Sequence, residues 1–325
     1  MWQHQKFLIF FRNNIRITGN GKGINVSFAD ATRNYSRLCI ATMPNKPITV
    51  DFRKFTPSGG GDFQHPAGRY ALTSDEKGNA YLYGTFDRYA EVTVKYREAT
   101  LATHTFLQKT ENAMSYALDA TVISANSAEE IKSAIQKEVA DSKTAIRLNL
   151  ASDAGDNELK AIREAFENVK SGTIDLTLIG CKEIPADGLK ELWPLKSISL
   201  PDVTTLGKRA LKYCENLEAV NAPKVTAIDQ QAFYRCQRLE NVILGTLTDV
   251  RGEANSEDGI FDGISAALRR TVLYLPESQE IMQGEFDENS NQYIWKPTGE
   301  KYFASPDKDN GIFLGYQFML VKSWE

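Results

Sequence analysis

Residues that bind metals or carry redox chemistry are scarce in this sequence. Its 325 residues include four cysteines and three histidines. No two cysteines form a C-x-x-C pair, so neither a metal knuckle nor a thioredoxin-type redox motif is supported. The histidines His4, His65 and His104 lie far apart along the chain. We therefore expect no metal site and no cofactor.

The sequence also lacks a strong charge of one sign and a long apolar run. It has 38 basic and 42 acidic side chains, a net charge of −4, and no long run of like charges. This balance gives no field that would attract nucleic acid or an anionic membrane. The apolar run at residues 6–11 is too short for a membrane span or a signal-peptide core. We expect no nucleic-acid partner and no membrane span, and the sequence shows no export signal.

No motif of a known catalytic site stands out. The sequence contains no G-x-S-x-G nucleophile motif. Gly19–Gly23 lacks the G-x-x-x-x-G-K-[ST] pattern of a phosphate loop and precedes a strand pattern, so we interpret it as a turn. Asp51 with Asp62 would be a candidate for the carboxylate pair of a glycosidase, and Asp87 with Glu91 would be another. Nothing in the sequence brings either pair together, and the sequence favours a non-enzymatic protein.

Residues 1–124 carry the period-two alternation that is typical of half-buried strands. Apolar residues alternate with polar ones at 24–28, 48–52, 92–96 and 116–122. Turn signals that contain glycine or proline separate these runs. Several short strands joined by turns predict an antiparallel β-sandwich domain.

Residues 125–277 form the second predicted domain and begin with alternating helices and strands. Ser127 precedes a pair of glutamates and is a candidate N-cap for a helix with apolar residues at four-residue spacing. A strand pattern at 146–150, a helix pattern around 159–166 and a strand pattern at 174–178 follow. We therefore expect helices at the N-terminal end of this domain.

A 22-residue repeat follows, and it is the most informative feature of the sequence. Leu195–Asn216 and Leu217–Arg238 align column by column, and a third row begins at Leu239. Apolar residues, a proline, a threonine and a cysteine recur at matching positions in the two full rows. A period of about 20–29 residues with an L-x-x-L-x-L core predicts a leucine-rich-repeat solenoid. Each coil of such a solenoid buries its apolar face only against its neighbours.

The rows predict a loop, a C-terminal cap and the number of strands in the solenoid. The polar segment 251–259 interrupts the fourth row and should bulge as a loop, after which Phe261 resumes the column of Phe233. The aromatic-rich segment 278–325 is interpreted as a C-terminal cap over the open end. We expect six parallel strands, stacked about 4.8 Å apart, near residues 148, 176, 198, 220, 242 and 273.

The outward face of the parallel sheet is the predicted binding surface. Its side chains alternate with the inward ones and are small and mostly polar. The alternative is a solvated sheet that binds nothing. The face comprises Asp175, Thr177, Ser197, Ser199, Ala219, Asn221, Asn241, Ile243 and Tyr274.

Cys214 and Cys236 occupy the same column in adjacent rows. Their α-carbons should lie about 5 Å apart, within disulfide range. Side chains in a ladder point in parallel, however, which is poor disulfide geometry. We expect two buried free thiols, with a disulfide as the alternative.

The repeats resemble the BspA-type leucine-rich repeat family of bacterial surface proteins. Leu217–Arg238 follow the motif L-x-x-I-x-L-P-x-V-T-x-I-x-x-x-A-F-x-x-C-x-x, with Ala222 in place of the second strand leucine. Leu195–Asn216 follow it with Leu211 in place of the phenylalanine. The resemblance covers residues 146–276.

The N-terminal domain resembles fimbrillin-type β-sandwich domains through the run Gly78–Gly84 and a later Val-Thr-Val strand. Together the two resemblances imply a protein that Bacteroidetes export to the cell surface, where it binds a protein or glycan. The first functional hypothesis is accordingly a non-enzymatic adhesion or recognition protein. The second is a structural subunit of a fimbrial or other surface assembly. The third is a carbohydrate-active enzyme with the solenoid as an accessory.

Overall fold

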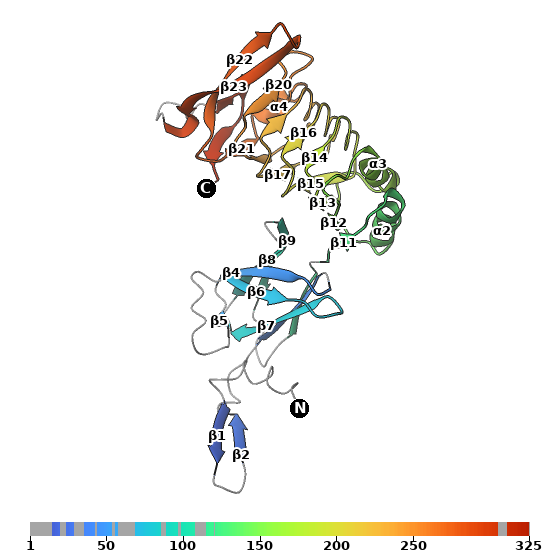
Figure 1. The fold of residues 1–325 in the computed structure, drawn as a ribbon, viewed down its shortest axis with the longest axis vertical. Coiled ribbons are helices and arrows are strands. Elements are labelled where there is room, and N and C mark those ends of the chain that lie inside the picture. The colour runs from blue at the N-terminus through green and yellow to red at the C-terminus, as the bar shows by residue number, and fades with distance from the viewer. Residues whose placement is uncertain are drawn as a thin grey trace. The chain divides into compact units, whose positions relative to one another are not determined.

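The chain forms two compact units, Met1–Val122 and Ile123–Glu325 (Figure 1). Among the described residues, the first unit consists of strands and connecting segments, and the second contains every helix. The computed structural model describes residues 15–19, 24–28, 36–42, 44–53, 56–57, 69–85, 89–96, 99–107, 115–119, 121–304 and 311–324.

The described strands of the first unit form two four-stranded sheets and a separate hairpin. One sheet has the order β10-β3-β7-β5, the other has the order β6-β4-β8-β9, and β1 pairs with β2. Every pair is antiparallel except β10 with β3, which is parallel. The strands are β1 Ile15–Gly19, β2 Ile24–Phe28, β3 Ser36–Ala41, β4 Pro47–Arg53, β5 Thr56–Pro57, β6 Arg69–Thr73, β7 Asn79–Thr85, β8 Tyr89–Tyr96, β9 Ala99–Leu107 and β10 Ser115–Asp119.

The period-two alternation of the sequence reappears as alternating burial in these strands. Ile48 and Val50 of β4 are buried, and Thr49 between them is half-buried. The parallel pairing of β10 with β3 departs from the antiparallel arrangement that we expected. Alternation specifies which side chains point inward but not the direction of the partner strand. The packing of the two sheets as a sandwich stays a prediction.

The second unit begins with the short strand β11 Ile123–Ser124, and two helices and two strands follow it in the order that the sequence predicts. Helix α2 spans Ala128–Ala140 and helix α3 spans Asp156–Ala165. Ser127 is the N-cap of α2, because its side chain accepts a hydrogen bond from the backbone N–H of Glu130. The apolar side chains of both helices belong to the same buried core as the strands of the repeats.

The 22-residue period builds one parallel sheet with the strand order β11-β12-β13-β15-β17-β19-β21-β26. Its strands pair one repeat apart, so that Ile198 lies beside Val220 and Val220 lies beside Val242. The expected number of six strands is too low, because β11 and β26 lie outside the repeat and add a strand at each end. The strands are β11 Ile123–Ser124, β12 Ala145–Asn149, β13 Ile174–Ile179, β15 Leu195–Ser199, β17 Ala219–Ala222, β19 Asn241–Leu244, β21 Val272–Leu275 and β26 Leu320–Ser323.

A second ladder runs along the coils, with the order β14-β16-β18-β20-β23-β22, and its first four strands have only two or three residues each. The first four are parallel, and β23 closes the ladder by pairing antiparallel with β20 and β22. Between these strands and the next sheet strand lies the return segment of each coil, which includes residues 186–192 in the first coil. The strands of this ladder are β14 Glu183–Ile184, β16 Thr205–Leu206, β18 Ala227–Ile228, β20 Asp249–Arg251, β22 Glu280–Asp287 and β23 Gln292–Lys301.

The core of each coil is filled by the columns that the sequence alignment identified. In the second row these are Leu217, Val220, Val225, Ile228 and Phe233, all 0–1% exposed. Complete burial of one such aliphatic side chain contributes roughly 1.5–3 kcal/mol. Because each coil supplies several of them and none is buried by its own coil alone, stacking of the coils stabilises the fold.

Aromatic rings join the last coils to the C-terminal segment. The ring of Phe261 stacks on that of Phe233 with centroids 5.1 Å apart. Tyr316 and Phe318 contact Phe261 edge-on at 5.5 and 5.4 Å. The C-terminal segment also contains η2 Tyr302–Ala304, β24 Ile312–Phe313 and β25 Tyr316–Gln317, and α4 Ser265–Leu268 precedes β21.

The polar segment 251–259 is less free than the expected bulging loop. Arg251 belongs to β20, and the N–H of Gly252 donates a 2.8 Å hydrogen bond to the carbonyl of Tyr293. The indole N–H of Trp295 donates to the carbonyl of Gly252 at 3.0 Å. The segment therefore turns against the β22–β23 hairpin, a partner that the repeat pattern does not predict.

Candidate binding surfaces

The predicted binding residues lie on the sheet face, defined as the outward side of β13, β15, β17, β19 and β21. Strand register arranges them in two rows. One row runs from Asp175 through Ser197 and Ala219 to Asn241. The other row consists of Thr177, Ser199, Asn221, Ile243 and Tyr274.

The two rows differ in how far their side chains reach into solvent. Asp175 and Asn241 are exposed, and the hydroxyl of Ser197 donates a 2.5 Å hydrogen bond to the carboxylate of Asp175. Thr177 is only 8% exposed, and the buried Oγ of Ser199 has no hydrogen-bond partner. A partner on this face would therefore meet the first row before the second.

The row from Thr177 to Tyr274 also offers contacts beyond its first two residues. Asn221 and Tyr274 are half-buried. Tyr274 pairs with Lys322 of β26, so the row continues beyond the repeats into the C-terminal strand. The structure thus brings all the predicted residues onto one face but leaves Thr177 and Ser199 poorly accessible.

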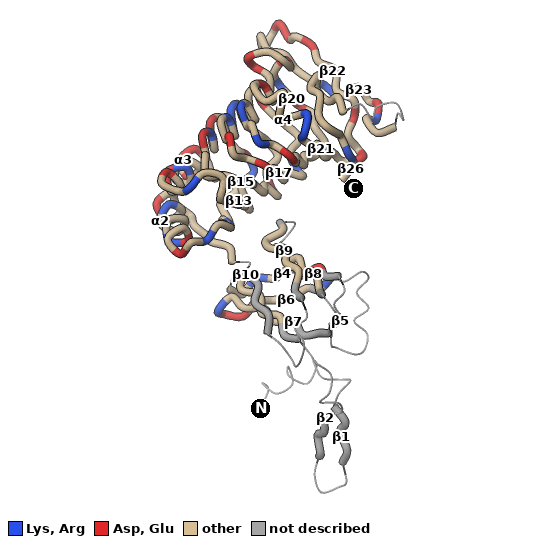
Figure 2. The backbone as a smooth tube through the Cα atoms, turned by 180° about the vertical axis from the view of Figure 1, so that it is seen from behind, with Lys and Arg blue, Asp and Glu red and all other residues tan. Residues whose placement is uncertain are grey.

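A second surface, the return face, was missed in the sequence. It is formed by the outward side chains of the return segments, and Figure 2 shows charged residues following the coils between α3 and α4. The signal for it was present in the rows, because charged or amide residues recur in the same columns. The return face comprises Asp187, Lys190, Glu191, Lys208, Arg209, Lys212, Tyr213, Gln231, Tyr234 and Arg235, and the buried Gln230 lies beneath it.

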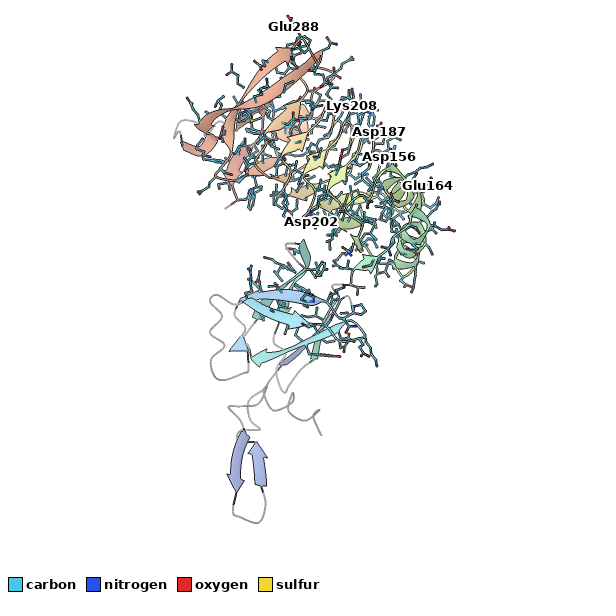
Figure 3. The ribbon with its side chains drawn as sticks, in the orientation of Figure 1. Asp156, Glu164, Asp187, Asp202, Lys208 and Glu288 are labelled. Carbon is cyan, nitrogen blue, oxygen red and sulfur yellow. The ribbon has the colours of Figure 1, made fainter. Side chains whose placement is uncertain are left out.

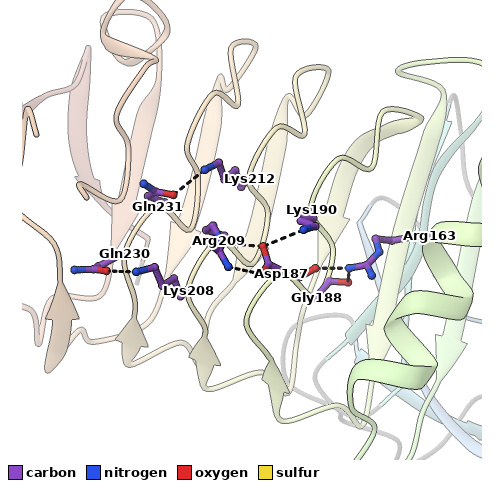
Figure 4. A network of polar contacts seen from close by, with 9 residues as sticks. All are labelled: Arg163, Asp187, Gly188, Lys190, Lys208, Arg209, Lys212, Gln230 and Gln231. Atoms are coloured by element: carbon purple, nitrogen blue, oxygen red, sulfur yellow. Dashed lines mark hydrogen bonds and ion pairs between the residues drawn. The ribbon is translucent and has the colours of Figure 1, made fainter. Parts of the chain in front are cut away.

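Polar contacts link successive coils across the return face (Figure 4). Asp187 accepts a 2.8 Å hydrogen bond from Arg209 Nε and lies 3.4 Å from Lys190 Nζ. One coil further on, Lys208 donates to the Gln230 side chain at 2.7 Å. The Arg209–Asp187 and Lys208–Gln230 contacts join adjacent coils, and the Lys190–Asp187 contact lies within one coil, so the side chains form a ladder along the solenoid.

The electrostatic balance of the return face changes along this ladder. Burial raises the pKa of Asp187, but the hydrogen bonds and charges of Arg209 and Lys190 outweigh it, and the pKa lies below its usual value. Lys208 and Lys212 instead contact Gln230 and Gln231, which are uncharged. The return face is therefore more basic in its second coil than in its first.

Two tyrosines add aromatic surface beside these cations. The rings of Tyr213 and Tyr234 meet edge-on with centroids 5.7 Å apart. Lys212 Nζ lies 5.2 and 4.8 Å from the two centroids, and the Arg235 guanidinium lies 5.8 and 5.7 Å from them. Such geometry is that of a cation–π cluster, so the cations here are partly satisfied by rings instead of carboxylates.

The period of these ladders agrees with a known repeat family. Residues 156–257 match the family model of the BspA-type leucine-rich repeat region, in six copies. The match covers about a third of the chain and lies inside the segment 146–276 that resembled the family. No curated protein and no solved structure matches the chain. The resemblance of the N-terminal unit to fimbrillin-type domains stays a prediction.

Asp202 anchors the BspA-type coils at the ends of the sheet strands, away from Asp187 and Lys208 (Figure 3). It is 8% exposed, accepts a 3.1 Å hydrogen bond from Gly180 N–H and lies 3.2 Å from Lys224 Nζ. Burial raises the pKa of Asp202, but these contacts outweigh it and hold the pKa below its usual value. Asp202 is therefore a charged residue that joins three successive coils.

Cys214 and Cys236 of the BspA-type repeats are fully buried free thiols, which confirms the expectation. Their Sγ atoms donate 3.2 Å hydrogen bonds to the carbonyls of Leu189 and Leu211. Each thiol thus points to the backbone of the preceding coil and not to the other sulfur. Burial raises the pKa of Cys214 to about 12, so the thiol is protonated and poorly reactive.

Asp51 of the first unit is a surface ion-pair residue. Its carboxylate lies 2.7 Å from Arg69 Nε and 2.8 Å from Lys95 Nζ. The hydrogen bond from Arg69 and the contact with Lys95 lower the pKa of Asp51 to about 2. A carboxyl group with this pKa is a poor proton donor at neutral pH.

Within the described part of the chain, no group of three or more His, Cys, Asp or Glu side chains is placed to hold a metal ion. No helix that the structure describes is both long and apolar enough to cross a membrane. Several residues singled out in the sequence lie outside the described ones: residues 6–11, residues 20–23, His4, His65, Asp62 and Asp87.

Proposed function

We propose that this chain is a non-enzymatic binding protein whose solenoid recognises a macromolecular partner at the cell surface. The BspA-type repeats support a protein-binding role. The observation that carries the proposal is the in-register presentation of outward side chains over consecutive coils. The strands hold these side chains in place before a partner binds. Binding therefore costs little free energy for ordering this surface.

We place the partner on the sheet face. Its accessible row offers one carboxylate, Asp175, with a hydroxyl and an amide at Ser197 and Asn241. These groups suit a partner that presents backbone or side-chain hydrogen-bond donors, and Tyr274 adds an aromatic contact near the C-terminal end. Thr177 and Ser199 would form the packed floor beneath this contact.

The return face is the competing surface. Its second coil presents Lys208, Arg209 and Lys212 beside uncharged glutamines. A partner on this face would be acidic, and its binding would weaken steeply with salt.

A binding experiment on the full chain separates the two surfaces. Immobilised extracellular-matrix proteins and a glycan array are the probes. The sheet-face variant carries Asp175→Lys and Asn241→Lys, and the matched return-face variant carries Lys208→Glu and Lys212→Glu. We expect the sheet-face variant to lose at least tenfold in affinity and the return-face variant to lose less than twofold. The reverse result would move the site to the return face.

Three other measurements test the remaining parts of the proposal. Surface location requires that protease added to intact cells of the source organism removes the chain. Concentration-dependent polymerisation in light scattering, without binding to any probe, would instead favour a structural subunit of a surface assembly. Hydrolysis of polysaccharides by the full chain would contradict a non-enzymatic role.

A further inference from the structure

A cleft of about 600 Å³ lies between α3 and the return segment of the first coil. Its lining includes Phe166 and Leu192, which are 1–2% exposed, together with Pro194, which is buried. The lining also includes Trp193, which is 53% exposed. The cleft therefore combines a buried apolar base with an accessible indole.

Trp193 departs from the pattern of its own column. One and two rows later the same position holds Glu215 and Gln237, which are polar. A large aromatic side chain at a solvent-exposed repeat position adds nothing to the stacked core and leaves apolar surface in water. The packing of the repeat therefore does not explain the tryptophan at this position.

The backbone holds Trp193 firmly while leaving its ring accessible. The carbonyl of Trp193 accepts 3.0 Å hydrogen bonds from the N–H of Gly172 and from the side-chain amide of Asn216. The N–H of Trp193 donates to the carbonyl of Glu191 at 3.0 Å. The backbone that carries the indole is therefore a hydrogen-bonded turn, which reduces the ordering that binding would require.

The charges around the cleft cancel. Its lining contains three acidic residues, Glu164, Glu167 and Glu191, and three basic residues, Lys160, Arg163 and Lys190. The Arg163 guanidinium donates to the carbonyls of Asp187 and Gly188 (Figure 4), and Glu164 pairs with Lys132 and Lys160. Glu167 and Glu191 are exposed and offer carboxylate acceptors, and Lys190, whose ammonium also lies 3.4 Å from Asp187, carries further N–H donors.

We propose that this cleft binds an uncharged saccharide. A sugar ring has one face of C–H groups, which would lie against the Trp193 indole, and hydroxyls at its edge. Those hydroxyls would hydrogen-bond with the side chains of Glu167, Lys190 and Glu191, which offer both donors and acceptors. Because the acidic and basic residues of the lining are equal in number, the cleft does not attract a ligand of either charge. It therefore favours a neutral sugar over a basic peptide.

The test uses the full chain and titrates it with neutral oligosaccharides of glucose, mannose, galactose and xylose. The quenching of tryptophan fluorescence and the heat of binding are both measured. We expect at least one oligosaccharide to bind, with Trp193→Ala lowering the affinity at least tenfold and Trp193→Phe lowering it less. Phe286→Ala, which removes an aromatic side chain that is 58% exposed on β22, is the matched control and should bind as the parent does.

Three results would overturn the proposal. The first is no binding of any oligosaccharide at millimolar concentration. The second is equal binding by the parent chain and Trp193→Ala, with unchanged unfolding midpoints. The third is binding of a lysine-rich peptide, but of no sugar, that Glu167→Gln and Glu191→Gln abolish. Failure of the sheet-face variants leaves this site unaffected, because none of its residues lies on the sheet face.

Discussion

The sheet face and the return face are presented by the same coils, yet they differ in chemistry. The sheet face carries small side chains such as Ser197 and Asn241 and one exposed carboxylate, Asp175. The return face carries several cations and two tyrosines. The repeat demands apolar residues only at inward positions, so the two outward surfaces of one coil are free to serve different purposes.

The backbones of the two faces are also stabilised differently. Strands of the sheet face adopt extended conformations that any residue accepts. On the return face, Asp187, Arg209 and Gln231 have φ values of 59°, 60° and 58°. A non-glycine residue in the left-handed region is uncommon and costs of order 1–3 kcal/mol when strained. Hydrogen bonds from the N–H of Asp187 and Arg209 to carbonyls of the next coil, both 2.9 Å, hold these turns in place.

The largest expected effect concerns the division between inward and outward side chains. Val220 is 1% exposed between Ile198 and Val242, and Asn221 faces outward on the same strand. Val220→Asp buries an unpartnered carboxylate and should abolish cooperative unfolding of the second unit. Asn221→Asp should change the free energy of unfolding by about 1 kcal/mol or less. Urea unfolding followed by circular dichroism measures both, and equal stabilities would mean that the register is wrong.

A second matched pair makes the same comparison on the return side. Phe233 is fully buried on Phe261, whereas its neighbour Tyr234 is half-buried on the return face. Phe233→Ala should cost about 3–5 kcal/mol because it leaves a cavity. Tyr234→Ala should cost about 1 kcal/mol, from its contacts with Tyr213 and the cations. If chemical denaturation shows equal losses, the tyrosine cluster belongs to the core and not to the surface.

A third prediction concerns pH. Asp202→Asn should lower the free energy of unfolding at neutral pH by about 1–3 kcal/mol, because a buried acceptor of charge-assisted hydrogen bonds is lost. The pKa of Asp202 in the folded chain lies below its ordinary value of 3.8. Its carboxylate therefore stabilises the fold above that value, and the contribution disappears as the pH falls through the folded pKa. Unfolding midpoints of parent and variant should converge in acid, and a constant difference would contradict this role.

The smallest effect is expected at the more exposed carboxylate of the return face. Asp187→Asn removes the ion pairs with Arg209 and Lys190, whose side chains are 38–39% exposed. Pairs of this kind contribute about 0.2–1 kcal/mol. The loss should shrink further in 1 M salt, since screening weakens exposed pairs. A loss as large as that of Asp202→Asn, and independent of salt, would show that the return-face ladder holds the coils together.

Part of the candidate site was predictable from residues alone. Period-two alternation within each row identified Asp175, Ser197 and Asn241 as outward, and strand register places them in one row. Alternation does not measure depth, so it did not distinguish these from Thr177, which is 8% exposed. Depth depends on the size of neighbouring side chains across strands, which only the packed sheet specifies.

The return face and the cleft at Trp193 were not predicted for a different reason. The left-handed residues of these turns, Asp187 and Arg209, are not glycines, although Gly188 and Gly207 lie in the same turns. The recurring charged and amide columns mark these positions as polar, but the conformation that sets the direction of their side chains is not marked by the residue type. Trp193 differs in its column only by contrast with Glu215, and its position beside α3 depends on a helix that precedes the 22-residue rows.

The sequence by itself determined the repeat, its inward columns and the helix start at Ser127, because periodicity and capping are local properties of a chain. Tertiary structure alone decided the strands β11 and β26 at the ends of the sheet and the parallel partner of β10. It also decided that segment 251–259 lies against the β22–β23 hairpin. These features depend on hydrogen bonds between segments that are far apart in the chain. The residues next to each strand do not specify which distant strand it will pair with.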